Sequence, residues 1–196
     1  MKQFLYSIFA LLTLVACTET YIEEQGTIQT DTPDELIVSF EGGNDTRIQL
    51  NEAQKTVWTK GDLVSVFYRS DANQKWQYQG WTGSRIGNLK RVSEGTATTK
   101  TNRIVVAYPY NENYYFNAET YNIEATLPAT QHYLHGSYGL DGNIMVSSSY
   151  FTQVSLKNVC GWLKLQLTGN GEMVRSITLR GNNGEQVAGD ILIVAE

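Results

Sequence analysis

Short runs in which apolar and polar residues alternate recur from Asp34 onwards, and this feature constrains the fold more than any other. Leu36, Val38 and Phe40 hold alternate positions of the first run. A spacing of two places such residues on one face of a β-strand. Glycine, asparagine and aspartate separate the runs, and no window shows a helical period over three turns. Many short strands divided by turns favour an all-β sandwich over an α/β arrangement.

Further runs extend this pattern along the chain. The other predicted strands are residues 62–68, 76–81, 104–108 and 161–168. Residues 104–108 are almost continuously apolar, which is typical of a strand covered on both faces. In residues 161–168 the leucines take every second position, so we expect their face to belong to the core. An Asn-Gly pair within residues 181–184 predicts a hairpin connection between residues 177–179 and 187–188.

Composition excludes several classes of protein. The 196 residues are 41% hydrophobic, 11% aromatic and 18% charged, a balance that argues against a disordered or low-complexity chain. The formal net charge of -5 lacks the basic surface that nucleic-acid binding requires, so no nucleic acid is expected as a partner. Two cysteines provide neither a disulfide framework nor a cysteine-rich zinc site.

The first residues read as an export signal. Lys2 precedes an apolar run that ends at Ala16, short of the roughly 20 apolar residues of a membrane-spanning helix. The run closes as Leu-Val-Ala-Cys, which matches the bacterial lipobox. We therefore predict a signal peptide over residues 1–16, cleavage between Ala16 and Cys17, and acylation of Cys17. Several acyl chains anchor a protein stably to a membrane. The alternative is an ordinary signal peptide that a cysteine happens to follow.

The remainder then divides into two parts. Residues 17–33 are acidic and polar, which predicts a flexible tether. Residues 34–196 form the predicted β domain. Its last residues, 191–196, are a mostly apolar run with no turn after it, which leads us to expect a domain truncated at its carboxyl end.

Motifs for chemistry are weak. His132 and His135 have a spacing that zinc sites use, but glycines nearby favour a loop and no third ligand is evident. Residues 147–149 are serines without the glycines of a nucleophile elbow, and residues 141–143 read as a turn. Cys160 lies beside the leucine face and is interpreted as a small buried hydrophobe. We expect no metal, no cofactor and no enzymatic activity.

Aromatic residues are numerous, with 12 tyrosines and 4 tryptophans. Trp76 and Trp81 are candidates for stacking on sugars, while the competing interpretation places such rings in the core or in cross-strand pairs.

Several stretches, in order, resemble the fimbrillin family, which comprises lipoprotein pilus subunits and related surface proteins of gut and oral anaerobes. The stretches are residues 37–40 with 46–47, residues 57–62 with 64–67, residues 127–131, residues 159–167 with 176–179, and residues 181–185 with 188–189. Together with the lipobox they span nearly the whole chain from Leu36 to Gly189.

The resemblance implies a transthyretin-like Greek-key β-sandwich, followed in the family by a second sandwich. It also implies transport to the outer membrane, removal of the first strand by an arginine-specific protease, and insertion of a strand from another subunit. Carried over to this sequence, Arg47 is the candidate processing site. The candidate displaced strand carries Leu36, Val38 and Phe40. An ordinary exposed arginine at a strand entry is the alternative for Arg47.

The expected function is therefore that of a structural or accessory subunit of cell-surface fimbriae, anchored by lipid in the outer membrane and supporting adhesion. Expected partners are other fimbrial subunits, the outer membrane through the lipid, and ligands on host or bacterial surfaces. The alternative is a glycan-binding surface lipoprotein of a polysaccharide-uptake system, in which Trp76 and Trp81 would contact sugar.

Overall fold

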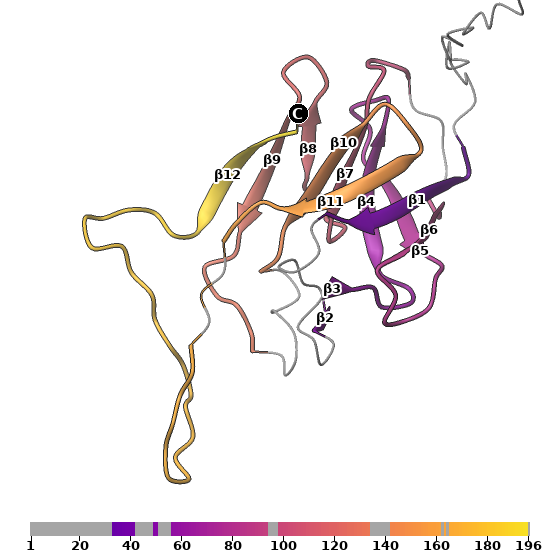
Figure 1. The fold of residues 1–196 in the computed structure, drawn as a ribbon. Coiled ribbons are helices and arrows are strands. Elements are labelled where there is room, and N and C mark those ends of the chain that lie inside the picture. The colour runs from indigo at the N-terminus through magenta and orange to yellow at the C-terminus, as the bar shows by residue number, and fades with distance from the viewer. Residues whose placement is uncertain are drawn as a thin grey trace, which may run out of the picture. The chain divides into compact units, whose positions relative to one another are not determined.

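The chain folds as an all-β protein in the computed structural model, which describes residues 33–41, 49–50, 56–93, 98–133, 142–161, 163 and 165–195. No helix occurs among these residues. The strands are β1 (Glu35–Phe40), β2 (Gln49–Leu50), β3 (Thr56–Val57), β4 (Leu63–Tyr68), β5 (Gln74–Tyr78), β6 (Ile86–Arg91), β7 (Ile104–Tyr108), β8 (Tyr115–Asn117), β9 (Asn122–Leu127), β10 (Met145–Ser149), β11 (Gln153–Asn158) and β12 (Gly189–Val194) (Figure 1).

A closed barrel forms the larger part of the fold. Its strand order is β1-β11-β10-β7-β4-β5-β6, and β6 returns to β1 to close the ring. All of these neighbours are antiparallel except β1 and β11, which run parallel. Closure leaves no strand of the barrel with an unpaired edge, which is how barrels avoid edge-to-edge association. β1, first of the described strands in sequence, is thus paired on both sides.

The barrel interior holds the first hydrophobic core. Alternate residues of each strand point inward, as the period of two predicts, and aromatic rings fill the centre. Trp58 stacks between Phe40 and Tyr78 with ring centroids 4.6 and 4.9 Å away. Tyr108 meets the same indole edge-on at 5.6 Å. Such stacked and edge-on pairs stabilise a core beyond the area that they bury.

A three-stranded sheet, ordered β12-β9-β8, builds a second core against the outer face of the barrel. Phe67 of β4 and Val105 of β7 point outward from the barrel and pack with Phe116, Ile123 and Ile193 of this sheet. β7 is therefore buried at every position, which confirms the prediction of a strand covered on both faces.

The segment between β11 and β12 differs from the sequence-based expectation. It runs away from the barrel in Figure 1 as a long excursion, and its described residues carry no strand. Leu163, Leu165 and Leu167 are 64%, 47% and 58% exposed, so the prediction that their face belongs to the core is wrong. Alternation makes a face suitable for burial, but here neither of the two cores covers it. The turn predicted at residues 181–184 is present, with Gly184 at a φ of 82°, but residues 177–179 and 187–188 form no strands, so the predicted hairpin is wrong.

Candidate functional site

β1 and the slot in which it lies form the candidate site. Leu36, Val38 and Phe40 point into the barrel and are buried, while Glu35 and Ile37 face outward. The three inward residues that the sequence selected therefore lie on one face, and that face is part of the core. Removing this strand would expose an apolar slot through the barrel wall.

Backbone pairing on both sides holds β1 in place. Its residues pair with β6 from Glu35 opposite Lys90 to Ser39 opposite Ile86. On the other side, Ile37 to Phe40 pair in parallel with β11. The Ser39 hydroxyl adds a long hydrogen bond of 3.4 Å to the carbonyl of Val154. Loss of β1 would leave two neighbouring strands with unsatisfied backbone donors and acceptors, which a new strand can pair with.

Ion pairs mark the two ends of β1. Asp34 lies 3.5 Å from Arg91, and Glu41 lies 2.9 Å from Lys157. All four side chains are at least partly exposed to solvent, where such pairs contribute about 0 to 1 kcal/mol. The pairs therefore set the position of β1 along its neighbours more than they stabilise it.

The turn that leads from Trp58 into β4 contains a largely buried carboxyl group, that of Asp62. The Asp62 carboxylate accepts a hydrogen bond of 2.8 Å from the Thr59 backbone N–H, and the Asp62 N–H donates to the Thr59 carbonyl at 3.0 Å. Burial disfavours the charged form and raises the pKa of Asp62 from 3.8 to about 6, although the Thr59 bond lowers it. Burial, with the nearby Asp62 charge, also raises the pKa of Tyr108.

This shift predicts a pH-dependent stability. The pKa of Asp62 is higher in the folded state than the unfolded value of 3.8, so the folded state favours the protonated carboxyl. The stability that this contributes is complete below pH 3.8 and is lost as the pH rises through 6. We expect Asp62→Asn, which keeps an acceptor for Thr59, to raise the free energy of unfolding by about 1 to 2 kcal/mol at pH 7.5, after discounting for solvent screening. Urea titrations of variant and parent at several pH values measure the difference, which should vanish near pH 3.5.

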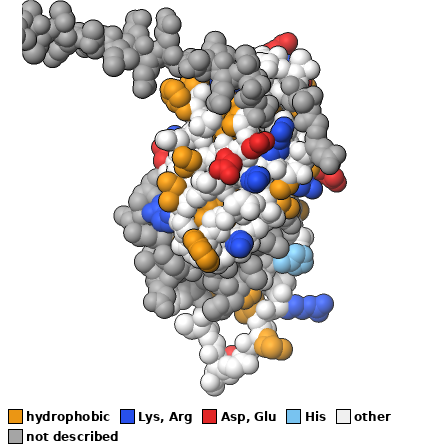
Figure 2. Space-filling model, turned by 90° about the vertical axis from the view of Figure 1, so that its right-hand side faces the viewer, with side chains coloured by type: hydrophobic (Ala, Val, Ile, Leu, Met, Phe, Trp, Pro, Cys, Tyr) orange, Lys and Arg blue, Asp and Glu red, His pale blue; other side chains and the backbone are white. Residues whose placement is uncertain are grey.

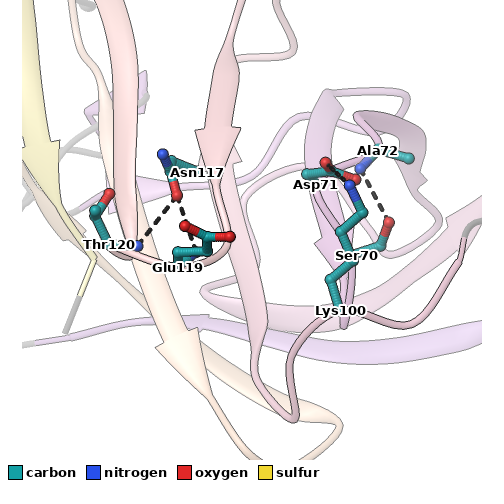
Figure 3. A network of polar contacts seen from close by, with 7 residues as sticks. All are labelled: Ser70, Asp71, Ala72, Lys100, Asn117, Glu119 and Thr120. Carbon is teal, nitrogen blue, oxygen red and sulfur yellow. Dashed lines mark hydrogen bonds and ion pairs between the residues drawn. The ribbon is translucent and has the colours of Figure 1, made fainter.

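Two polar networks fix the turns after β4 and β8 (Figure 3). Lys100 pairs with Asp71, and this contact lowers the pKa of Asp71 and raises that of Lys100. The Asn117 side-chain carbonyl accepts hydrogen bonds from the N–H groups of Glu119 and Thr120, at 2.9 and 3.1 Å. The Asn117 contacts satisfy their own turn, as Asx-type turns do, whereas the Lys100–Asp71 pair joins two separate loops. Neither brings together an acid, a base and a nucleophile.

A second feature lies beside β12. A groove of about 580 Å³ runs between this strand and the outer faces of β10 and β11. Next to Ser148 and Ala195 of the groove lining, the Arg103 guanidinium lies between the rings of Tyr121 and Tyr150, 4.8 and 5.0 Å from their centroids. It also donates hydrogen bonds to the hydroxyls of Tyr150 and Ser148, at 3.1 and 3.3 Å. Arg103 is therefore a positioned cation beside Ser148 of the groove lining, while Lys157 lies in the lining itself and pairs with Glu41.

Another face of the surface is seen in Figure 2. Figure 2 views the molecule from the right-hand side of Figure 1, and the apolar side chains there lie in separate patches among polar and charged ones. Trp81 is 84% exposed, so stacking of this ring on a sugar stays a prediction.

The prediction that Trp76 also stacks on sugar is not supported by the structure. Its ring is fully buried in the barrel, and its indole N–H donates to Gln74 at 3.2 Å. Sugar stacking at Trp76 is therefore wrong, because no sugar can reach the ring. The interpretation of this tryptophan as a core residue is confirmed.

The other predicted residues divide between described and undescribed parts of the chain. Ala16, Cys17, Arg47 and His135 lie outside the described residues, so cleavage, acylation and processing at these positions stay predictions. His132 is exposed, and the described residues hold no cluster of three metal-ligating side chains. Cys160 is a free, half-buried thiol, less buried than the sequence indicated.

Sequence reasoning missed three residues that matter here. Trp58 was noted only as part of the resemblance, and Asp62 only as the first residue of a predicted strand, although Trp58 followed by Thr-Lys-Gly-Asp signals a turn after a core ring. Arg103 carried no sequence signal, since its partners Tyr121, Tyr150 and Ser148 come from distant parts of the chain.

No protein-family model, no curated protein and no solved structure matches this chain. Within the described part of the chain, a helix of the length and hydropathy needed to cross a membrane is absent.

Proposed function

We propose that this protein is a structural or accessory subunit of cell-surface fimbriae, exported as an outer-membrane lipoprotein and assembled by strand exchange. In this proposal the fold is a variant of the transthyretin-like Greek-key sandwich that the fimbrillin resemblance implies. Cys17 carries the lipid, Arg47 is cleaved by an arginine-specific protease, and β1 is the strand that another subunit replaces.

One observation carries the proposal: β1 is a terminal segment of the described fold, yet it closes the barrel. It contributes three core residues and pairs with β6 and β11 along its length. A strand in this position can leave without disturbing the order of the others. The slot left behind would offer unpaired backbone and an apolar floor, the two features that strand addition uses.

Cleavage at Arg47 tests the proposal. Full-length lipoprotein treated with an arginine-specific protease should be cut between β1 and β2 and should then form ordered multimers, visible by electron microscopy and size-exclusion chromatography. We expect Arg47→Gln to abolish both the cut and the multimers. Arg47→Lys is the matched control, because it keeps the charge and removes only the protease's recognition residue.

A peptide spanning residues 34–41 provides a second readout. Added in excess after cleavage, it should refill the slot and suppress assembly, while the same peptide with Val38→Asp should not. A chain that is cut at Arg47 but stays monomeric would refute the polymerising role.

A further inference from the structure

The open edge of β12 lies beside the groove of about 580 Å³. β12 pairs with β9 on one side, and within the described residues nothing pairs with its other side. Beneath this open edge, the outward residues of β10 and β11, among them Val146, Ser148 and Ser155, form the floor. An open strand edge above a partly apolar floor is the arrangement that accepts an added strand.

The groove has a charged end that indicates which strand fits. The Ala195 N–H, just after β12, donates to the Tyr121 carbonyl at 2.8 Å, and Tyr121 stacks on Arg103. Arg103 therefore lies at the carboxyl end of β12. Among the described residues no carboxylate lies within ion-pair distance of this guanidinium. The guanidinium retains N–H groups for a carboxylate, and carboxylate binding by arginine is frequently bidentate.

The chain itself carries a segment that could supply the added strand. Residues 172–180 belong to the excursion between β11 and β12, and every one of them is exposed. Met173, Val174, Ile177 and Leu179 are apolar residues without a core, and Glu172 precedes them. Met173 alone is 95% exposed. A contiguous exposed apolar stretch of this kind marks a site of interaction with another surface.

We propose that residues 173–179 of a second copy of this chain add antiparallel to the open edge of β12, with Glu172 of that copy bound to Arg103. This inference rests on the proposed function, in which subunits assemble through strands. An antiparallel neighbour begins where β12 ends, so Glu172 reaches the Arg103 end. Seven added residues span about 23 Å, close to the roughly 20 Å of β12.

The register also decides which side chains are buried. Ile191, Ile193 and Ala195 face the barrel, whereas Leu192 and Val194 face outward. Residues of the added strand that lie opposite the inward positions share their face. Placing Met173 opposite Ala195 puts Arg175 opposite Ile193 and Ile177 opposite Ile191, so the face over the floor carries two apolar side chains and the long stem of Arg175, whose charged end can reach solvent. Because the described part of each chain holds both this groove and this segment, two copies can exchange segments reciprocally about a two-fold axis.

A charge-reversal mixture tests this pairing. The full-length chain in detergent should form dimers in native mass spectrometry. Arg103→Glu and Glu172→Arg should each weaken dimerisation by on the order of tenfold, because each places like charges together. Mixing the two variants, one of them isotopically labelled, should restore dimers that contain one copy of each. Lys90→Glu and Glu112→Arg are matched reversals at exposed positions elsewhere and should leave dimerisation unchanged.

The outcomes separate the alternatives. A parent chain that stays monomeric, or single variants that dimerise as the parent does, would overturn the inference. If the mixture fails but the double variant regains the stability that each single variant lost, the strand binds its own chain and not a second copy. Thermal unfolding of each variant, compared with the parent chain, shows whether a substitution has disturbed folding. Arg47-dependent multimers that persist in Arg103→Glu would overturn only this pairing and leave the proposed function standing.

Discussion

Val38→Asp is expected to unfold the barrel or bring it close to unfolding. Val38 is fully buried in the barrel core, and its backbone pairs with Gly87 on one side and Val154 on the other. An aspartate there would place a carboxylate among apolar side chains, without a partner. Burial of an unpaired charge costs several kcal/mol, and we expect a loss of about 4 kcal/mol or more in the free energy of unfolding. Domains of this size have only about 5 to 15 kcal/mol in total.

The neighbouring residue provides the control. Ile37 points outward and is 40% exposed, so Ile37→Asp introduces the same charge on the same strand without burying it. We expect a change below about 1 kcal/mol for this variant. Urea denaturation followed by tryptophan fluorescence compares the two. Equal effects of the two substitutions would show that β1 does not contribute its inward face to the core.

Local pattern predicted the strands whose burial depends on their own residues. β1, β4 and β7 were expected close to their observed bounds, because alternation or continuous apolarity already defines which faces can be buried. Which strands pair with one another could not be predicted from the sequence. The parallel contact between β1 and β11 joins residues more than a hundred positions apart, and no local feature records it.

The errors have a common physical cause. Leucines at alternate positions of residues 161–168 define an apolar face, but only a second layer can make it a core, and the layers are set by the whole topology. The two candidate sugar-stacking tryptophans show the same limit. Trp76 and Trp81 came from one predicted strand, yet β5 ends at Tyr78, so one ring entered the barrel and the other lies in the turn that follows.

Trp58→Ala is the second substitution from which we expect a large effect. The indole is fully buried and contacts Phe40, Tyr78 and Tyr108, so it links β1 to β5 and β7. Truncation of a buried tryptophan removes its contacts and leaves a cavity, which costs about 3 to 5 kcal/mol.

Trp58→Phe separates the ring contacts from the indole's polar atom. The indole N–H has no hydrogen-bond acceptor among the described residues, so phenylalanine forfeits no such bond there. We therefore expect Trp58→Phe to cost only about 1 to 2 kcal/mol. A double-mutant cycle with Phe40→Leu should give a coupling energy of about 0.5 to 1.5 kcal/mol, since the two rings stack. This coupling holds β1 to the barrel, and in the proposed function the same variants should speed exchange of β1 for the peptide of residues 34–41. Additive effects of the two substitutions would mean that the stack does not retain β1.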